Sequence, residues 1–254
     1  MKMKRILLSI LIVALLISTS LASVSAKVGT AASPEFMGLE KAVFIHYEAP
    51  AKPPWAGGPK SSEEGYKLFR GGVKWADGDT PVSYSINIDS IPEGLDDSEV
   101  VDAITAAFEE WDSVTAGELF STPTTASNAT GFDPTANDIF WADLDQGVIA
   151  VTYFWWYTGT KDLAAFDMVF NTDYLWGING VEPADANTTL GNTSFMDVRN
   201  IATHEAGHTL VLGDLYQSQY SEMTMYGYST FGEVKAISLE LGDIAGAQVL
   251  YGAP

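Results

Sequence analysis

Apolar positions between residues 71 and 254 recur with two different periods. In "PVSYSINID", every second residue from Val82 to Ile88 is apolar, which predicts a strand with one buried face. In "DDSEVVDAITAAFEEWDSV", the apolar residues from Val100 to Trp111 share one helical stripe, and acidic residues at its start favour a helix. An amphipathic helix on a sheet is therefore expected. Further strand candidates, separated by Gly- and Asp-containing turns, are residues 137–143, 147–157 and 163–171.

The first 70 residues differ from the rest of the chain in composition. Residues 1–26 begin with basic residues, continue with an apolar run and end in small residues suited to cleavage after Ala26, which is typical of a secretory signal peptide. An uncleaved membrane anchor is the alternative, but the apolar run is shorter than the about 20 residues that span a bilayer. Residues 27–70 contain one short apolar run, "AVFIHYE", and a stretch rich in Pro, Gly, Ser and Glu. We expect a pro-segment or N-terminal extension there, followed by one domain over 71–254.

The charge and cysteine content exclude several functions. The chain has 13 basic and 33 acidic residues, a net charge of −20. Removal of Lys2, Lys4 and Arg5 with the signal would leave 10 basic against 33 acidic residues, a net charge of −23. A nucleic-acid partner is therefore not expected. The absence of cysteine excludes a thiolate nucleophile, ligand or latency switch. We expect an extracellular monomer without a membrane anchor once the signal is removed.

The stretch "HEAGHTLVLGDLY" at 204–216 carries the chemistry. "SFMD" before it is a capping-box pattern, with Ser194 as the cap, so a helix is expected from there to about Leu212. On such a helix His204 and His208 lie one turn apart and both can bind one zinc ion, while Glu205 faces the cleft. A zinc site needs a third ligand, and the next candidate is Asp214. An alternative is that Asp214 is an ordinary turn residue.

This motif resembles that of the metzincin zinc endopeptidases, and within them the matrixin-like group. The family patterns are HExxHxxGxxH and HExxHxxGxxD, and "HEAGHTLVLGD" is similar to the aspartate variant of snapalysin-type enzymes. The resemblance covers most of residues 71–254 and implies zinc ligands His204, His208 and Asp214, with Glu205 as the catalytic base. It also implies that Met225 in "TMYGYS" is the Met-turn methionine beneath the ligands; the alternative is core filler.

The resemblance also implies the fold. We expect an α+β domain with a twisted, mostly parallel five-stranded sheet, an antiparallel edge strand and three main helices. The sequence departs from the family at Val211, which stands where the family has glycine. Because a branched side chain is strained in a left-handed bend, we infer that the helix continues past Val211 and turns at Gly213.

The chemistry expected of such a site is peptide hydrolysis. Zinc held by two imidazoles and a carboxylate keeps a position for water, and Glu205 would take a proton from that water during attack on a peptide carbonyl. A polypeptide substrate should pair as an extended strand with residues 147–157 and fill a pocket walled by residues 226–232. The rival hypothesis is a metzincin-fold metal-binding module without turnover, acting as a protein- or peptide-binding domain.

Two further hypotheses concern the surroundings of the site. Structural calcium could be bound near strand-joining loops, although solvated acidic turns explain the same residues, which are Asp133, Asp138, Asp143 and Asp145. Residues 27–70 could form a latency segment across the cleft. In the absence of cysteine, His46 and Glu48 are the side chains of that segment suited to block zinc.

Overall fold

The computed structural model describes residues 38–49, 65–126, 131–132, 134–178 and 194–254. The expected signal peptide, 1–26, lies outside these residues. Residues from Gly38 to Pro254 form one compact unit. In the described part of the chain, no helix is long and apolar enough to cross a membrane.

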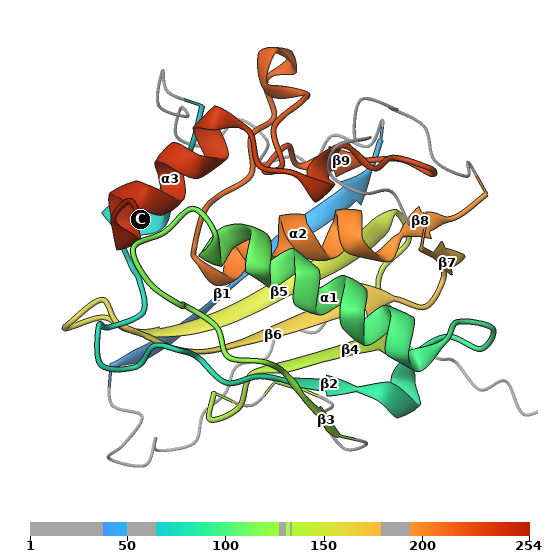
Figure 1. Ribbon diagram of the computed structural model, residues 1–254, viewed down its shortest axis with the longest axis horizontal. Coiled ribbons are helices and arrows are strands. Elements are labelled where there is room, and N and C mark those ends of the chain that lie inside the picture. Colours follow the sequence, from blue (N-terminus) through green and yellow to red (C-terminus); the bar gives the residue numbers. More distant parts are fainter. Residues whose placement is uncertain (1–37, 50–64, 127–130, 133, 179–193) are drawn as a thin grey trace, which may run out of the picture. The chain divides into compact units, whose positions relative to one another are not determined.

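A seven-stranded mixed sheet organises this unit, in the order β3-β2-β4-β6-β5-β1-β9 (Figure 1). Strand β5 is antiparallel to both β6 and β1, whereas the other neighbours run parallel. The α+β class and the mostly parallel sheet with an antiparallel strand are confirmed. The strands are β1 (Leu39–Glu48), β2 (Ser85–Asn87), β3 (Thr124–Ala126), β4 (Asp138–Ala142), β5 (Val148–Tyr157), β6 (Leu163–Asn171) and β9 (Tyr228–Ser229), with β7 (Trp176–Gly177) and β8 (Met196–Asp197) in a separate parallel pair.

The first main helix, α1 (Asp97–Asp112), follows the predicted pattern. The Asp96 side chain caps it by accepting hydrogen bonds from the backbone N–H groups of Ser98 and Glu99. The four large residues of its apolar stripe are at most 1% exposed, and each such burial contributes roughly 1.5–3 kcal/mol; they are Val100, Ile104, Phe108 and Trp111. The other main helices are α2 (Val198–Thr209) and α3 (Leu241–Tyr251), and 3-10 turns occur at Phe69–Gly71, Ile88–Ser90, Ser218–Tyr220 and Lys235–Ile237.

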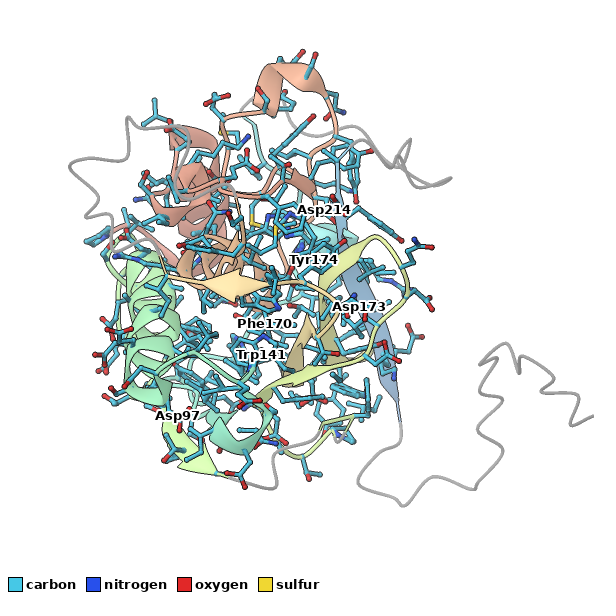
Figure 2. All side chains as sticks on the ribbon, turned by 90° about the vertical axis from the view of Figure 1, so that its right-hand side faces the viewer. Asp97, Trp141, Phe170, Asp173, Tyr174 and Asp214 are labelled. Carbon is cyan, nitrogen blue, oxygen red and sulfur yellow. The ribbon has the colours of Figure 1, made fainter. Side chains whose placement is uncertain are left out.

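Helices α1 and α2 lie next to each other on one face of the sheet (Figure 1). The Trp111 indole N–H donates to the Thr203 carbonyl at 2.8 Å, which ties α1 to α2. Aromatic residues fill the space between helices and sheet; Trp141 and Phe170, for example, stack with ring centroids 4.6 Å apart in the interior (Figure 2). This packing fixes α2, which carries the HExxH motif, on the sheet.

Residues 147–157, which were expected to be free to pair with a substrate, contain β5, and β1 covers this strand. The nine partner pairs from Leu39–Tyr157 to Tyr47–Val148 run along almost the whole strand. The far side of β1 pairs in parallel with β9 through Tyr47 and Glu48. Part of the predicted extension thus belongs to the compact unit, because both faces of β1 are apolar: Ala42 and Phe44 pack against one core cluster, and Ile45 and Tyr47 against the other.

Candidate metal centre

Helix α2 starts and ends at different residues from those expected. Its cap is Asp197, not Ser194, and the Asp197 carboxylate accepts the Asn200 backbone N–H at 2.8 Å. The helix ends at Thr209 rather than near Leu212. Residues 196–197 are extended because they form the short strand β8. The helix can therefore begin only after Asp197, which is its cap.

The left-handed residue after α2 is Val211, with φ +64°, so the expected turn at Gly213 was wrong. The Val211 N–H donates to the His208 carbonyl, and the Leu212 N–H donates to Gly207. These bonds close the helix in the way that a glycine usually permits. Val211 is 1% exposed, so burial of its side chain offsets the strain of the left-handed conformation. The chain therefore turns where the family pattern has glycine, and Asp214 is brought back to α2.

Asp214 lies against both histidines of the motif. Its Oδ1 atom is 3.3 Å from His204 Nε2 and 3.3 Å from His208 Nε2. One ligand atom from each of the three residues lies within 4.8 Å of the others. The side chain of Asp214 is labelled in Figure 2, where it can be followed on the ribbon. The three predicted ligands are thus brought together.

The hydrogen bonds of the two imidazoles determine which nitrogen can bind a metal. His204 Nδ1 is 2.7 Å from the Thr224 carbonyl, and His208 Nδ1 is 2.7 Å from the Leu212 carbonyl. Since a carbonyl only accepts, each Nδ1 carries a proton, and in the neutral imidazole, which is the form that binds metal, each Nε2 then presents a lone pair. Both Nε2 atoms and Asp214 Oδ1 are buried without a hydrogen-bond partner among the described residues. Two lone pairs and a carboxylate oxygen that converge in this way fit a zinc ion.

The charge state of Asp214 agrees with this arrangement. Burial alone would raise its pKa, but the adjacent imidazoles of His208 and His204 outweigh burial and hold the pKa far below its usual value. Asp214 is therefore a carboxylate, the form that binds metal.

Glu205 lies on the same helix, next to this cluster. Its Oε2 atom accepts the Thr152 hydroxyl from β5 at 2.6 Å, and its Oε1 atom is 3.4 Å from Nδ1 of His46. Burial would raise the pKa of Glu205, yet His46 and the two motif histidines outweigh burial and lower it. Thr152 thus orients a carboxylate beside the candidate metal ligands.

Met225 lies directly beneath α2. A Cβ atom added to Gly207 would collide with the Met225 sulfur, so a residue without a side chain is needed between the two histidines. The Met225 N–H and the Thr224 N–H both donate to the buried carboxylate of Asp243 on α3, at 3.1 and 2.8 Å. The Met225 carbonyl accepts the N–H of Leu215, next to Asp214. The turn at Thr224 and Met225 therefore supports two candidate ligands. The Thr224 carbonyl holds His204, and the Met225 carbonyl holds the residue next to Asp214.

Sequence reasoning missed two residues that support the site, Thr152 and Asp243. Thr152 is the polar residue in a strand whose other residues are mainly apolar. Asp243 forms a capping box with Glu240 at the start of α3, a pattern visible in "LELGD".

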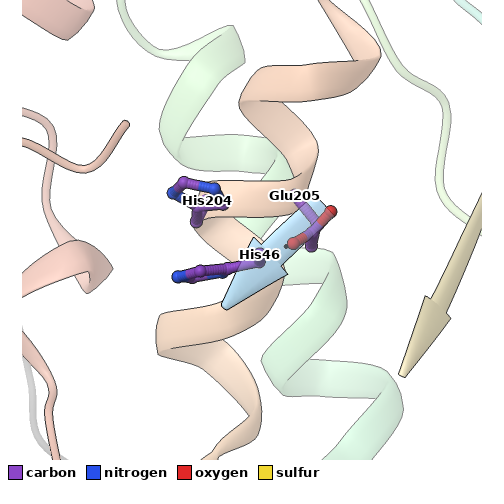
Figure 3. Close-up of side chains that lie close together, drawn as sticks. All are labelled: His46, His204 and Glu205. Atoms are coloured by element: carbon purple, nitrogen blue, oxygen red, sulfur yellow. Dashed lines mark ion pairs between the residues drawn. The ribbon is translucent and has the colours of Figure 1, made fainter. Parts of the chain in front are cut away.

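His46 of β1 also reaches the site. Its ring stacks on His204 with centroids 3.9 Å apart, and Figure 3 shows it beside the turn of α2 that carries His204 and Glu205. Burial, followed by the neighbouring His204, lowers the pKa of His46 to about 4. Glu48 points elsewhere and accepts the Tyr174 hydroxyl at 2.9 Å.

The expected calcium ligands do not form a comparable cluster in the described part of the chain. The two groups of three or more close ligand candidates found there are His204-His208-Asp214 and His46-His204-Glu205. Asp133 lies outside the described residues. Calcium binding stays a prediction.

Two cavities flank the metal centre along β1. One, of about 460 Å³, is lined by Tyr226, Tyr228 and Ser229 and neighbouring residues, which belong to the segment expected to wall a substrate pocket. The other, of about 650 Å³, lies between β1, residues 67–70 and residues 213–216.

The fold and this ligand arrangement define a protein of the matrixin type. Residues 74–252 match the Peptidase_M10 family model, described as matrixin, and the chain belongs to this family. The chain is also similar to metalloendoproteinase 2-MMP of Arabidopsis thaliana, with 28% identity over 193 residues. That alignment covers 74% of this chain and 45% of the plant protein, so the chain spans less than half the length of this relative.

Proposed function

We propose that this protein is an exported zinc endopeptidase. The observation that carries the proposal is the convergence of two buried, lone-pair-bearing Nε2 atoms and the Asp214 carboxylate on one point. Membership of the matrixin family and the metalloendoproteinase name of a relative support it. Export is inferred from the signal-like residues 1–26.

Each residue of the site would have a separate role in peptide hydrolysis. His204, His208 and Asp214 would hold the metal. When bound, zinc supplies a Lewis acid that polarises the peptide carbonyl and makes water more acidic. Glu205, oriented by Thr152, would take the proton of the attacking water and pass it to the leaving amine. Met225 would hold α2 and the loop that carries Asp214 in fixed relative positions, without touching the reacting atoms.

Metal content and a single substitution test the proposal. The full chain should contain about one zinc per molecule, and chelation should abolish cleavage of casein. Glu205→Gln should keep zinc but lose about 10²- to 10⁴-fold in turnover, because only the proton acceptor changes. Glu99→Gln, at an exposed position of α1, is the matched control and should cleave normally.

The rival function gives a different result. If the wild-type chain binds zinc at these residues but cleaves no protein or peptide, it is a metal-binding module and the endopeptidase proposal fails. Full proteolysis by a metal-stripped sample would exclude the zinc mechanism itself.

A further inference from the structure

A polar cavity of about 460 Å³ adjoins the metal centre on the side of β9. The chain at Gly227 connects the two. A Cβ atom added to Gly227 would lie 3.0 Å from the Cβ atom of Asp214 and would collide with the ring of Tyr216, which also lines the cavity. A ligand that binds the metal and extends toward β9 therefore enters this cavity. Its other polar walls include Tyr226, Tyr228, Glu233 and Lys235.

A lysine and a glutamate form a largely buried ion pair in the cavity wall. The Lys235 ammonium lies 2.5 Å from Oε1 of Glu233, and the two side chains are 18% and 13% exposed. The other carboxylate oxygen of Glu233 accepts the Ser229 hydroxyl at 2.7 Å and the Thr230 N–H at 3.1 Å. Both oxygens of Glu233 are thus used. The Lys235 ammonium has three N–H donors, and Glu233 is its one carboxylate partner in the described part of the chain.

Tyr228 supplies a second hydrogen-bond donor to the same cavity. Its hydroxyl oxygen is buried and has no hydrogen-bond partner within the described ranges of the chain. The ring is held between those of Tyr216 and Tyr226, with centroids 5.2 and 5.6 Å away. The Lys235 ammonium lies over the Tyr226 ring, 5.4 Å from its centroid. A buried hydroxyl without a partner is costly, so a ligand that pairs with it is stabilised.

The wall that carries the ion pair is fixed to the helix of the HExxH motif. Asn200 lies on α2, one turn before His204, and is 1% exposed. Its amide nitrogen donates to the Ser229 hydroxyl at 3.4 Å, and its carbonyl oxygen accepts the Ala236 N–H at 2.8 Å. Ser229 in turn donates to Glu233. The ion pair therefore has a fixed position relative to the metal ligands.

These donors determine which side chain the cavity fits. An apolar side chain would leave them unpaired in a buried site, and a lysine would face the like charge of Lys235. A side chain that accepts hydrogen bonds pairs with them instead. Because Glu233 already compensates the charge of Lys235, a neutral carboxamide enters at a lower desolvation cost than a second carboxylate.

We propose that this cavity is a specificity pocket for glutamine, in which Lys235 and Tyr228 donate hydrogen bonds to the carboxamide of a substrate side chain next to the scissile bond. This inference rests on the proposed function, because specificity presupposes a polypeptide substrate. Lys235 and Tyr228 are then specificity-determining residues that take no part in the chemical step.

Zinc-directed hydroxamates with one variable side chain test this pocket, because the hydroxamate group fixes the probe at the metal. The four probes carry the side chains of glutamine, glutamate, leucine and lysine. Calorimetry on the zinc-loaded full chain should show that the glutamine probe binds at least tenfold more tightly than the leucine probe. The glutamate probe should lie between them, and the lysine probe should bind most weakly. Equal affinity for the glutamine and leucine probes, or no binding by any probe, would overturn the proposal.

Two substitutions identify the donors. Lys235→Met and Tyr228→Phe each remove one donor but keep most of the side-chain volume, so each should lower the glutamine-to-leucine affinity ratio at least threefold. A general distortion of the site would weaken both probes alike and leave this ratio unchanged. Lys74→Met is the matched control, since Lys74 also pairs with an aspartate and lies over a tyrosine ring but does not line the cavity. A wild-type ratio in both pocket variants contradicts the assignment.

The pocket and the proposed function fail in different ways. If the affinity ratio is as expected but no peptide is cleaved, the pocket stands and the endopeptidase proposal fails. Digestion of a mixed peptide library, with the cleaved bonds identified by mass spectrometry, gives the opposite case. Cleavage without any preference for glutamine beside the cleaved bond would support the endopeptidase and contradict the specificity pocket.

Discussion

The Asp243 carboxylate on α3 accepts the backbone N–H of Thr224 at 2.8 Å, and the Thr224 carbonyl in turn holds His204 by Nδ1. Through this one residue the last helix of the chain fixes the orientation of a metal ligand. Asp243 also accepts the N–H groups of Met225 and Glu240, so both carboxylate oxygens are used.

Asp243→Asn should therefore weaken the metal centre from a distance. The new amide N–H₂ would face a backbone N–H, which costs about 1–3 kcal/mol of stability. Zinc affinity should fall about 10- to 100-fold, as for other outer-shell partners. Metal titration and urea unfolding measure the two effects. Asp102→Asn, at an exposed position inside α1, should change neither.

Asp214 can be tested as the third ligand by two substitutions. Asp214→Ala should cost more zinc affinity than the roughly 10- to 100-fold typical of an outer-shell partner, because a direct ligand is lost. Asp214→His should recover part of it if the loop at 211–214 can accommodate the longer side chain. Metal titration of both variants beside the wild type decides the question, and equal affinity of Asp214→Ala and wild type would place the third ligand elsewhere.

Thr152 should act on turnover rather than on metal binding. Thr152→Val keeps the shape of the side chain but removes the hydroxyl that orients Glu205. A proton acceptor held less well should lower kcat about 10- to 100-fold, with zinc content unchanged. Thr152→Ser retains the hydroxyl and should stay near the wild-type rate. Steady-state kinetics on a fluorogenic peptide would show the contrast, and a full-speed Thr152→Val enzyme would speak against this role.

Val211 provides a test of backbone strain. The left-handed conformation costs a residue with a Cβ atom about 1–2 kcal/mol, a cost that glycine avoids. Val211→Gly should therefore be more stable than Val211→Ala by about 1 kcal/mol, although both lose the buried valine side chain. At the exposed helical position Asp102 the order should reverse, with alanine more stable than glycine. Urea unfolding of the four variants gives the comparison.

Much of the domain is visible in local patterns. The period of apolar residues predicted α1 and β2, because burial of one face requires that spacing whatever the rest of the chain does. Apolar runs separated by Gly- and Asp-containing turns predicted β4, β5 and β6. The ligands His204 and His208 were also predictable, since a helix places residues four apart on one face. Asp214 followed from the resemblance of its spacing to the family pattern, and the structure brings it to the histidines.

Tertiary structure decided the rest. The branched side chain of Val211 disfavours a left-handed conformation. Packing in the core and the hydrogen bonds that close α2 nevertheless impose this conformation at Val211. Thr152 and Asp243 lie far from the motif in sequence, and only the packing of β5 and α3 against α2 gives them roles. The same holds for β1: its pattern reveals a short apolar strand, but which edge it covers depends on the competition among all unpaired edges, which no local pattern encodes.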